Sequence, residues 1–158
     1  MRFVIAAAAF VLSAASAQAQ VLVTLESKFS VKETADRLAA EIEKRGMKVA
    51  ARVDHAAGAK AAGMEMPPTE VVMFGNPKLG TPLMLSAPSI AIDLPMKMVV
   101  WQDKAGQDKA GQDKAVKVFI GYTAPEMLKQ RHGVKDRDDA FKTMAGALDG
   151  LAKAAGGQ

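Results

Sequence analysis

The chain contains no cysteine among its 158 residues. Without a thiol it can form no disulfide, no thiolate zinc site, no iron–sulfur cluster and no cysteine nucleophile. Aromatic residues make up only 5% of the chain, so platforms for stacking nucleic-acid bases are scarce. The formal net charge at pH 7 is only +4, and the lysines are scattered along the chain. We therefore expect no nucleic-acid partner.

The first 19 residues have the pattern of a secretory signal peptide. Arg2 supplies a positive charge, an apolar run follows, and the segment ends in Ala17-Gln18-Ala19, whose small residues suit a signal peptidase. We expect cleavage before Gln20 and a periplasmic or secreted mature protein. The apolar run is too short to cross a bilayer of about 30 Å, and no later segment resembles a membrane span, so no membrane insertion is expected after cleavage. The alternative is a buried N-terminal helix.

Residues 20–158 have the length of a single domain, which can bury an ordinary core without metal or disulfide. Ser30 and Glu33 form a capping box, which predicts a helix from Ser30 that ends at Gly46. Thr81-Pro82 resembles a second helix start, with Thr81 as the cap. Alternation and β-branched residues predict strands at 21–28, 47–53, 69–74, 96–101 and 116–122. Further helices are expected at 56–62, 125–132 and 136–154.

This order predicts an α+β fold. The chain starts strand-helix-strand, its last two strands form a hairpin, and helices occur near both ends, which favours an antiparallel sheet with helices packed on it. Between those last strands, the unit Gln-Asp-Lys-Ala occurs three times at five-residue spacing, beginning at Gln102, Gln107 and Gln112. A period of five fits neither helix nor strand, so we interpret the repeat as a lengthened hairpin loop.

Three sequence blocks carry a resemblance to a known family. They are Val53-Asp-His-Ala-Ala57, the run from Phe74 to Met84 with Asn76-Pro77 and Gly80-Thr81-Pro82, and Ile92-Asp-Leu-Pro95 continuing to Trp101. Over roughly residues 21–153 the chain resembles the domain of unknown function 302 family. The resemblance implies an α+β domain, compared with the BolA-like fold, that forms homodimers. It assigns no activity, because none is established for the family, and it identifies no cofactor. The tripled unit after Trp101 departs from the short turn expected there.

The best candidates for a ligand site lie between His55 and Trp101. His55 follows Asp54 at a strand end, where an imidazole can act as ligand or base. Asn76, Thr81 and Asp93 stand beside proline or glycine in the connecting segments. We expect these side chains and Trp101 to form one polar pocket for a small molecule. The alternative is turn chemistry for Asn76, Thr81 and Asp93, and a backbone hydrogen bond for His55.

Methionine suggests a different site. The ten methionines include the pairs Met64-Glu-Met66 and Met96-Lys-Met98, and thioethers suit copper(I) in an exported protein. Together with His55 they form an alternative soft-metal site. The competing interpretation is that methionines such as Met47, Met84 and Met144 fill the core. A conventional zinc site is not expected because only two histidines occur, without a helical His pair.

Motifs for standard enzyme chemistry are absent. No Gly-x-Ser-x-Gly, phosphate loop or dinucleotide fingerprint occurs. His132 falls in the last turn of a predicted helix, where the helix dipole explains a cation. We therefore predict an exported, non-catalytic domain that binds a small molecule or a protein partner. Copper binding is the alternative, and a hydrolase or isomerase using His55 and Asp93 is the third hypothesis.

Overall fold

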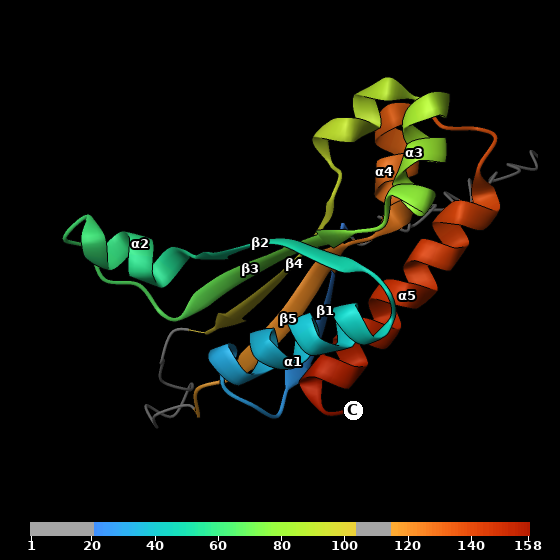
Figure 1. The fold of residues 1–158 in the computed structure, drawn as a ribbon. Coiled ribbons are helices and arrows are strands. Elements are labelled where there is room, and N and C mark those ends of the chain that lie inside the picture. Colours follow the sequence, from blue (N-terminus) through green and yellow to red (C-terminus); the bar gives the residue numbers. More distant parts are fainter. Residues whose placement is uncertain (1–20, 104–114) are drawn as a thin grey trace, which may run out of the picture.

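The computed structural model describes residues 21–103 and 115–158 (Figure 1). The predicted signal peptide, its cleavage site and most of the five-residue repeat lie outside these residues. Within the described residues, no helix is both long and apolar enough to cross a membrane.

One antiparallel sheet organises the fold. Its strands lie in the order β1-β5-β4-β3-β2, and every neighbouring pair is antiparallel. The strands are β1 (Leu22–Ser27), β2 (Lys48–Asp54), β3 (Thr69–Gly75), β4 (Met96–Gln102) and β5 (Val118–Thr123). The predicted hairpin is confirmed, since β4 pairs directly with β5. With the helices around it, this sheet confirms the predicted α+β class.

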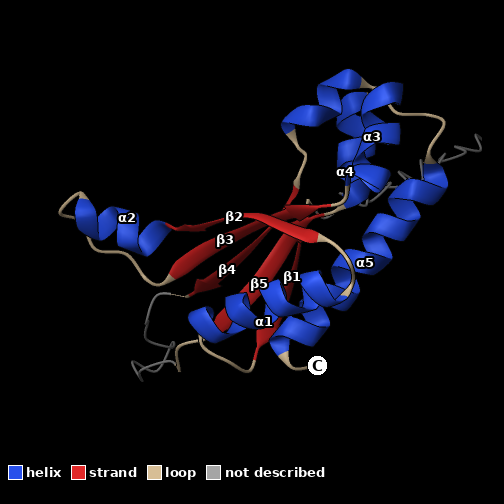
Figure 2. Ribbon diagram, viewed as in Figure 1, coloured by secondary structure: helices blue, strands red, loops and turns tan. Residues whose placement is uncertain are grey.

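Two helices cover one face of the sheet (Figure 2). They are α1 (Val31–Lys44) and α5 (Asp138–Gly156), and they contact each other as well as the strands. The predicted cap is confirmed, because the Ser30 hydroxyl accepts a hydrogen bond from the Glu33 amide at 3.2 Å. Fully buried side chains of the helices, such as Leu38 and Leu151, meet Met98 and Ile120 of the sheet. This layer is the hydrophobic core.

The two ends of the sheet differ (Figure 1). At one end, α3 (Pro77–Ser86), the 3-10 helix η1 (Pro88–Ile92) and α4 (Pro125–His132) form a lobe that buries Leu83 and Ile90 completely. We call it the pocket end. At the other, the far end, the short helix α2 (His55–Ala61) projects from β2 and buries none of its residues. Both ends use the same central strands.

The predicted helix start at Thr81 is wrong. Helix α3 begins four residues earlier, at Pro77, and Thr81 and Pro82 lie inside it. The Asn76 side chain caps the helix by accepting a hydrogen bond from the Lys78 amide at 2.9 Å, and Pro77 occupies the first helical position, where its missing N–H costs nothing. Asn-Pro and Thr-Pro carry the same start signal, and the earlier one initiates the helix.

Helices α1 and α5 leave the opposite face of the sheet uncovered (Figure 2), and we call it the outer face. On it, the rings of Trp101 and Phe119 stack with centroids 5.6 Å apart. The Trp101 ring also covers Gly121, where a Cβ would lie 3.1 Å from the indole. Gly121 is therefore needed for this close approach, and Trp101 has a packing role.

Candidate functional site

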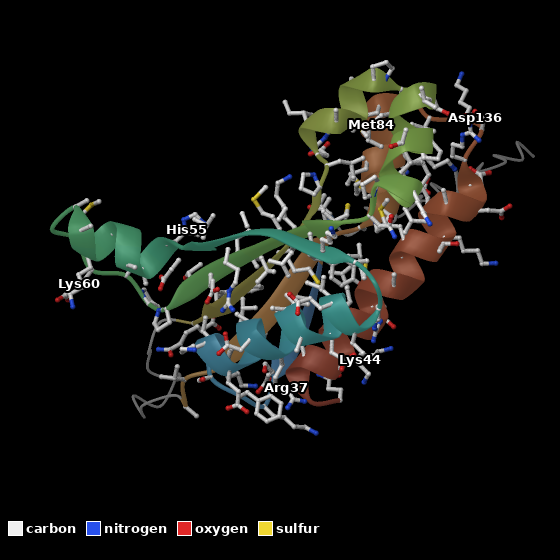
Figure 3. The ribbon with its side chains drawn as sticks, viewed as in Figure 1. Arg37, Lys44, His55, Lys60, Met84 and Asp136 are labelled. Atoms are coloured by element: carbon white, nitrogen blue, oxygen red, sulfur yellow. The ribbon has the colours of Figure 1, made fainter. Side chains whose placement is uncertain are left out.

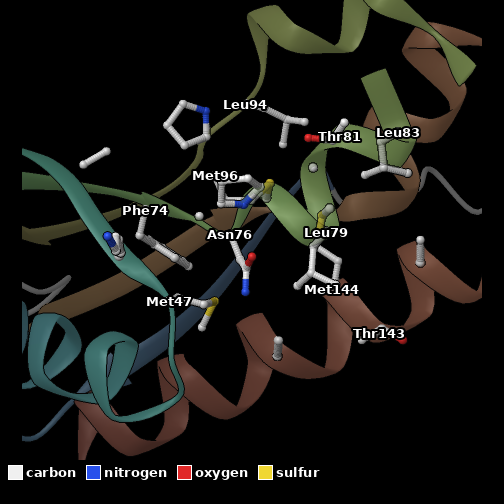
Figure 4. Close-up of a pocket in the computed structure, with 18 of the residues that line it drawn as sticks. Met47, Phe74, Asn76, Leu79, Thr81, Leu83, Leu94, Met96, Thr143 and Met144 are labelled. Atoms are coloured by element: carbon white, nitrogen blue, oxygen red, sulfur yellow. The ribbon is translucent and has the colours of Figure 1, made fainter. Parts of the chain in front are cut away.

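A pocket of about 510 Å³ opens at the pocket end, between the sheet, α3 and α5 (Figure 4). Its walls come from the start of β2, the end of β3, the start of β4 and the inward side of both helices. Aliphatic and thioether side chains form most of the lining, including four methionines: Met47, Met84, Met96 and Met144. A volume of this size falls in the range of small-molecule sites.

Local sequence explains how the pocket forms. The Asn76-Pro77 start turns the chain sharply from β3 into α3. Gly80 then faces the segment that leads into β4, where a Cβ would lie 3.7 Å from Leu94 and 4.0 Å from the Met84 methyl group. Opposite this wall, Met144 and Ala147 of α5 complete the lining. Two of the three blocks that carry the family resemblance therefore line this pocket.

Polar groups are few in the lining. Asn76, Thr81 and Thr143 supply amide and hydroxyl groups, Lys48 is the single charged residue, and no carboxylate lines the pocket. The structure thus brings together two of the predicted site residues, Asn76 and Thr81. The pocket is apolar, however, rather than the polar hollow that we expected.

Asp93 lies one residue before the pocket-lining Leu94 but is engaged elsewhere. Its carboxylate accepts hydrogen bonds from His132 Nε2 at 2.7 Å and from Arg131 Nη1 at 3.0 Å. The hydrogen bond from His132, with a further contribution from Arg131, lowers the pKa of Asp93 below its ordinary value despite partial burial. Asp93 therefore ties the end of η1 to α4 within the lobe.

His132 has a larger role than a dipole-compensating cation. Its side chain is 6% exposed, and its Nδ1 lies 3.0 Å from the Ser89 hydroxyl. Serine, histidine and carboxylate are the groups of a nucleophilic triad, but there the carboxylate bonds Nδ1 and the serine bonds Nε2. Here the two nitrogens are exchanged, and Ser89 does not line the pocket. The chain Ser89–His132–Asp93 fits a structural tie between η1 and α4.

His55 and Trp101 lie at the far end. In the strand register Lys48 faces Gly75 at the pocket end, whereas Asp54 faces Glu70 near the start of β3. Trp101 pairs with Thr69 at that same far end. Seven-residue strands span roughly 20 Å, so His55 is separated from Asn76 and Thr81, as Figure 3 shows for His55 and Met84. One pocket joining all five predicted residues is therefore not formed.

The same separation keeps His55 apart from Asp93, the two residues that the enzyme hypothesis paired. His55 directly follows β2 at the far end, whereas Asp93 lies shortly before β4 at the pocket end. The histidine that meets Asp93 is His132. Sequence spacing could not reveal this pair, because 39 residues separate its members.

The predicted soft-metal residues are also dispersed. Met64 and Met66 are exposed and follow α2 at the far end, whereas Met96 lines the pocket and Met98 is completely buried. With His55 they do not form one cluster. In the described ranges, no three His, Asp or Glu side chains are grouped so as to hold a metal ion.

The fold defines the class of protein first. It is an α+β domain similar to the crystal structure of an uncharacterized conserved protein DUF302 from Bacillus stearothermophilus, with a TM-score of 0.71 and 17% identity, covering 87% of this chain and 99% of that one. Residues 23–151 match the family model described as "Domain of unknown function DUF302". The chain belongs to this family, as the resemblance of its sequence blocks predicted.

Curated relatives share more sequence with the chain. Over 137 residues it is 42% identical to proteins named fluoride-specific ion channel FluC 1 from Brucella suis biovar 1 (strain 1330) and Brucella abortus biovar 1 (strain 9-941). The match covers 86% of this chain but only 50% and 47% of those proteins. The chain thus spans about half the length of the curated relatives it matches.

Proposed function

We propose that this protein is an exported, non-catalytic domain that binds a small, mainly apolar molecule in the pocket between the sheet, α3 and α5. The observation that carries the proposal is the pocket itself: about 510 Å³, lined by methionine, leucine and proline side chains. Water gains few hydrogen bonds from such walls, so an apolar ligand that displaces it is favoured.

The chemistry of the lining supports this function over catalysis. Methionine side chains are flexible and polarisable, so they adapt to ligands of different shape. Asp93, His132 and Arg131 bond one another, and none of the three lines the pocket. A pocket of this kind supplies binding energy through apolar burial, at about 0.8 kcal/mol per buried methylene group.

A blocked pocket tests the proposal. The probe is N-phenyl-1-naphthylamine, whose fluorescence rises in apolar surroundings, added to the processed chain. We expect saturable binding, lost by more than about tenfold in Ala147→Trp, where a bulky ring projects from α5 into the pocket. Lys142→Trp is the matched control, because Lys142 is exposed on the same helix outside the lining. Equal binding by both variants would place the probe elsewhere and refute the proposal.

Export is part of the same proposal. Its support is the pattern of residues 1–19, with a cation, an apolar run and Ala17-Gln18-Ala19. Intact mass measurement of the protein from the envelope fraction of its own cell should give a chain that begins at Gln20. Recovery of the chain with Met1 from the cytoplasm would reject export without affecting the pocket.

A homodimer is proposed on the family resemblance and on the outer face of the sheet. Beside the Trp101–Phe119 stack, that face carries the partly exposed apolar side chains of Val71, Met73 and Val99. A two-fold interface would bury this patch against the same patch of a second copy. Analytical ultracentrifugation should show a dimer that Val99→Glu dissociates. A monomer at all concentrations would reject it.

The curated relatives favour a second candidate function, binding to a partner protein. They are named as fluoride-specific ion channels, and the chain matches about half of their length. We propose that the domain can act beside such a channel. Deleting the gene should then lower the fluoride concentration that stops growth, with chloride as the control salt. Unchanged fluoride tolerance would remove this candidate.

A further inference from the structure

The few polar groups of the apolar pocket indicate what kind of ligand it takes. Asn76 is the most informative of them. Its Oδ1 accepts the hydrogen bond from the Lys78 amide, which assigns the other terminal atom as the NH₂ group. In Figure 4 the Asn76 amide points into the space between Met47 and Met144. The pocket therefore presents a hydrogen-bond donor within its thioether walls.

The charge of the lining has one sign. Lys48 is the single charged lining residue, and no aspartate or glutamate lines the pocket. Among the described residues no ion pair of Lys48 is formed. A donor amide and a cation without a competing carboxylate favour a ligand group that accepts hydrogen bonds and carries negative charge.

The rest of the lining favours an aliphatic body. Four methionines and four leucines surround the space, and Phe74, the one aromatic residue in the lining, is only 2% exposed. Little ring surface is thus available for stacking a flat aromatic ligand. Flexible thioether and isobutyl groups fit a flexible chain better. At about 30 Å³ for a group the size of water, the volume of about 510 Å³ accommodates a medium-length alkyl chain.

We propose that the ligand is a single-chain aliphatic amphiphile, whose anionic carboxylate accepts hydrogen bonds from the Asn76 amide on the Lys48 side of the pocket and whose alkyl chain lies among the methionines and leucines. This inference rests on the proposed function of the pocket. It adds the polarity, charge and shape of the ligand. A free medium-chain fatty acid has this chemistry.

The test compares decanoate with decanol, which has the same chain and a neutral head group. Isothermal titration of the processed wild-type chain should show decanoate binding at least about tenfold more tightly than decanol. Octanoate should bind more weakly than decanoate by up to about fourfold per methylene group removed. Equal affinity for decanoate and decanol would overturn the inference.

Asn76→Asp is the decisive variant. The aspartate keeps the oxygen that caps α3, but a second carboxylate oxygen replaces the NH₂ donor. We expect an unchanged melting temperature, a loss of at least about tenfold in decanoate affinity, and little change in the affinity for N-phenyl-1-naphthylamine. Asn76→Ser, which also caps the helix but has no amide, is the second variant. It should lose decanoate affinity without adding charge.

The outcomes separate the two proposals. If the wild-type chain binds neither decanoate nor the naphthylamine probe, the proposed function itself fails. If the probe binds and Ala147→Trp blocks it, but Asn76→Asp and Asn76→Ser bind decanoate as the wild type does, only the assignment of the head group to Asn76 is wrong. Lys48→Gln should weaken decanoate binding less than Asn76→Asp, and added salt should reduce the difference between Lys48→Gln and the wild type.

Discussion

The two ends of the sheet are built from the same strands but differ in what surrounds them. At the pocket end, α3 and the N-terminal half of α5 enclose the strand termini, and the lobe buries Leu83 and Ile90 completely. At the far end, α2 buries no residue, and Met64 is 61% exposed. At the pocket end, a pocket forms because other elements enclose the strand termini. His55, Asn76 and Asp93 all lie near strand ends, and the pocket of about 510 Å³ lies at the end that carries the lobe.

The largest contrast should appear in stability. Ile90→Ala removes a fully buried side chain from the lobe, and it should lower the free energy of unfolding by about 2–5 kcal/mol through lost burial and a residual cavity. Val53→Ala, in the β2 strand near the far end and 40% exposed, should cost less than about 1 kcal/mol. Urea unfolding measures both. Similar losses of unfolding free energy in the two variants would show that Ile90 contributes no more to the core than the half-exposed Val53.

A smaller contrast concerns two aspartates. Asp93→Asn removes the negative charge of the carboxylate that accepts hydrogen bonds from His132 and Arg131. It should lower the free energy of unfolding by about 1–3 kcal/mol at pH 7. Asp54 caps α2 by accepting a hydrogen bond from the Ala57 amide. Asp54→Asn should cost less than about 0.5 kcal/mol, because asparagine caps a helix as well as aspartate does.

The acid dependence of the Asp93 effect follows from its pKa. Because the folded-state pKa of Asp93 lies below its ordinary value, its contribution to stability is present above about pH 4 and is lost as pH falls through the folded pKa. The difference in unfolding free energy between the wild type and Asp93→Asn should therefore shrink below about pH 4. A difference that stays constant down to pH 2 would contradict this assignment.

Much of the fold was predictable because its signals are local. The Ser30 cap, the helical spacing of Val31, Ala35, Leu38 and Ile42, and the alternation from Lys48 to Val53 depend on neighbours a few residues away. The structure confirms these elements with shifts of one or two residues at their ends. The hairpin of β4 and β5 was also predictable, since adjacent strands without an intervening helix pair antiparallel.

The site was less predictable because it depends on which strand ends meet. Asn76 and Thr81 do line the pocket, but His55 was grouped with them from sequence proximity. The antiparallel register of β2 and β3 puts His55 at the opposite end. Met47, Met84 and Met144 were interpreted as core filler, and nothing in their spacing shows that α5 leaves a space beside α3. The Asp93–His132 pair required the tertiary fold.

Gly80 offers a stabilising substitution at the pocket end. Gly80 is the fourth residue of α3 and has an ordinary helical backbone. The methyl group of Gly80→Ala would lie in normal contact with Leu94, at 3.7 Å. This variant should gain about 0.4–1 kcal/mol, because alanine loses less backbone entropy on folding. The gain should appear in global urea unfolding. A destabilised variant would indicate that the wall at Leu94 cannot accept the methyl group.

The smallest effect is expected for the matched glycine at the far end. Gly58 is the fourth residue of α2, and a Cβ there meets nothing within 4 Å. Gly58→Ala should favour the helix by a similar local amount, but α2 buries no residue, so it can open while the rest of the domain stays folded. We therefore expect slower amide hydrogen exchange in α2 without a change in the global free energy of unfolding. A global gain as large as that of Gly80→Ala would mean that α2 unfolds together with the core, and the contrast between the two ends would then lie in ligand binding alone.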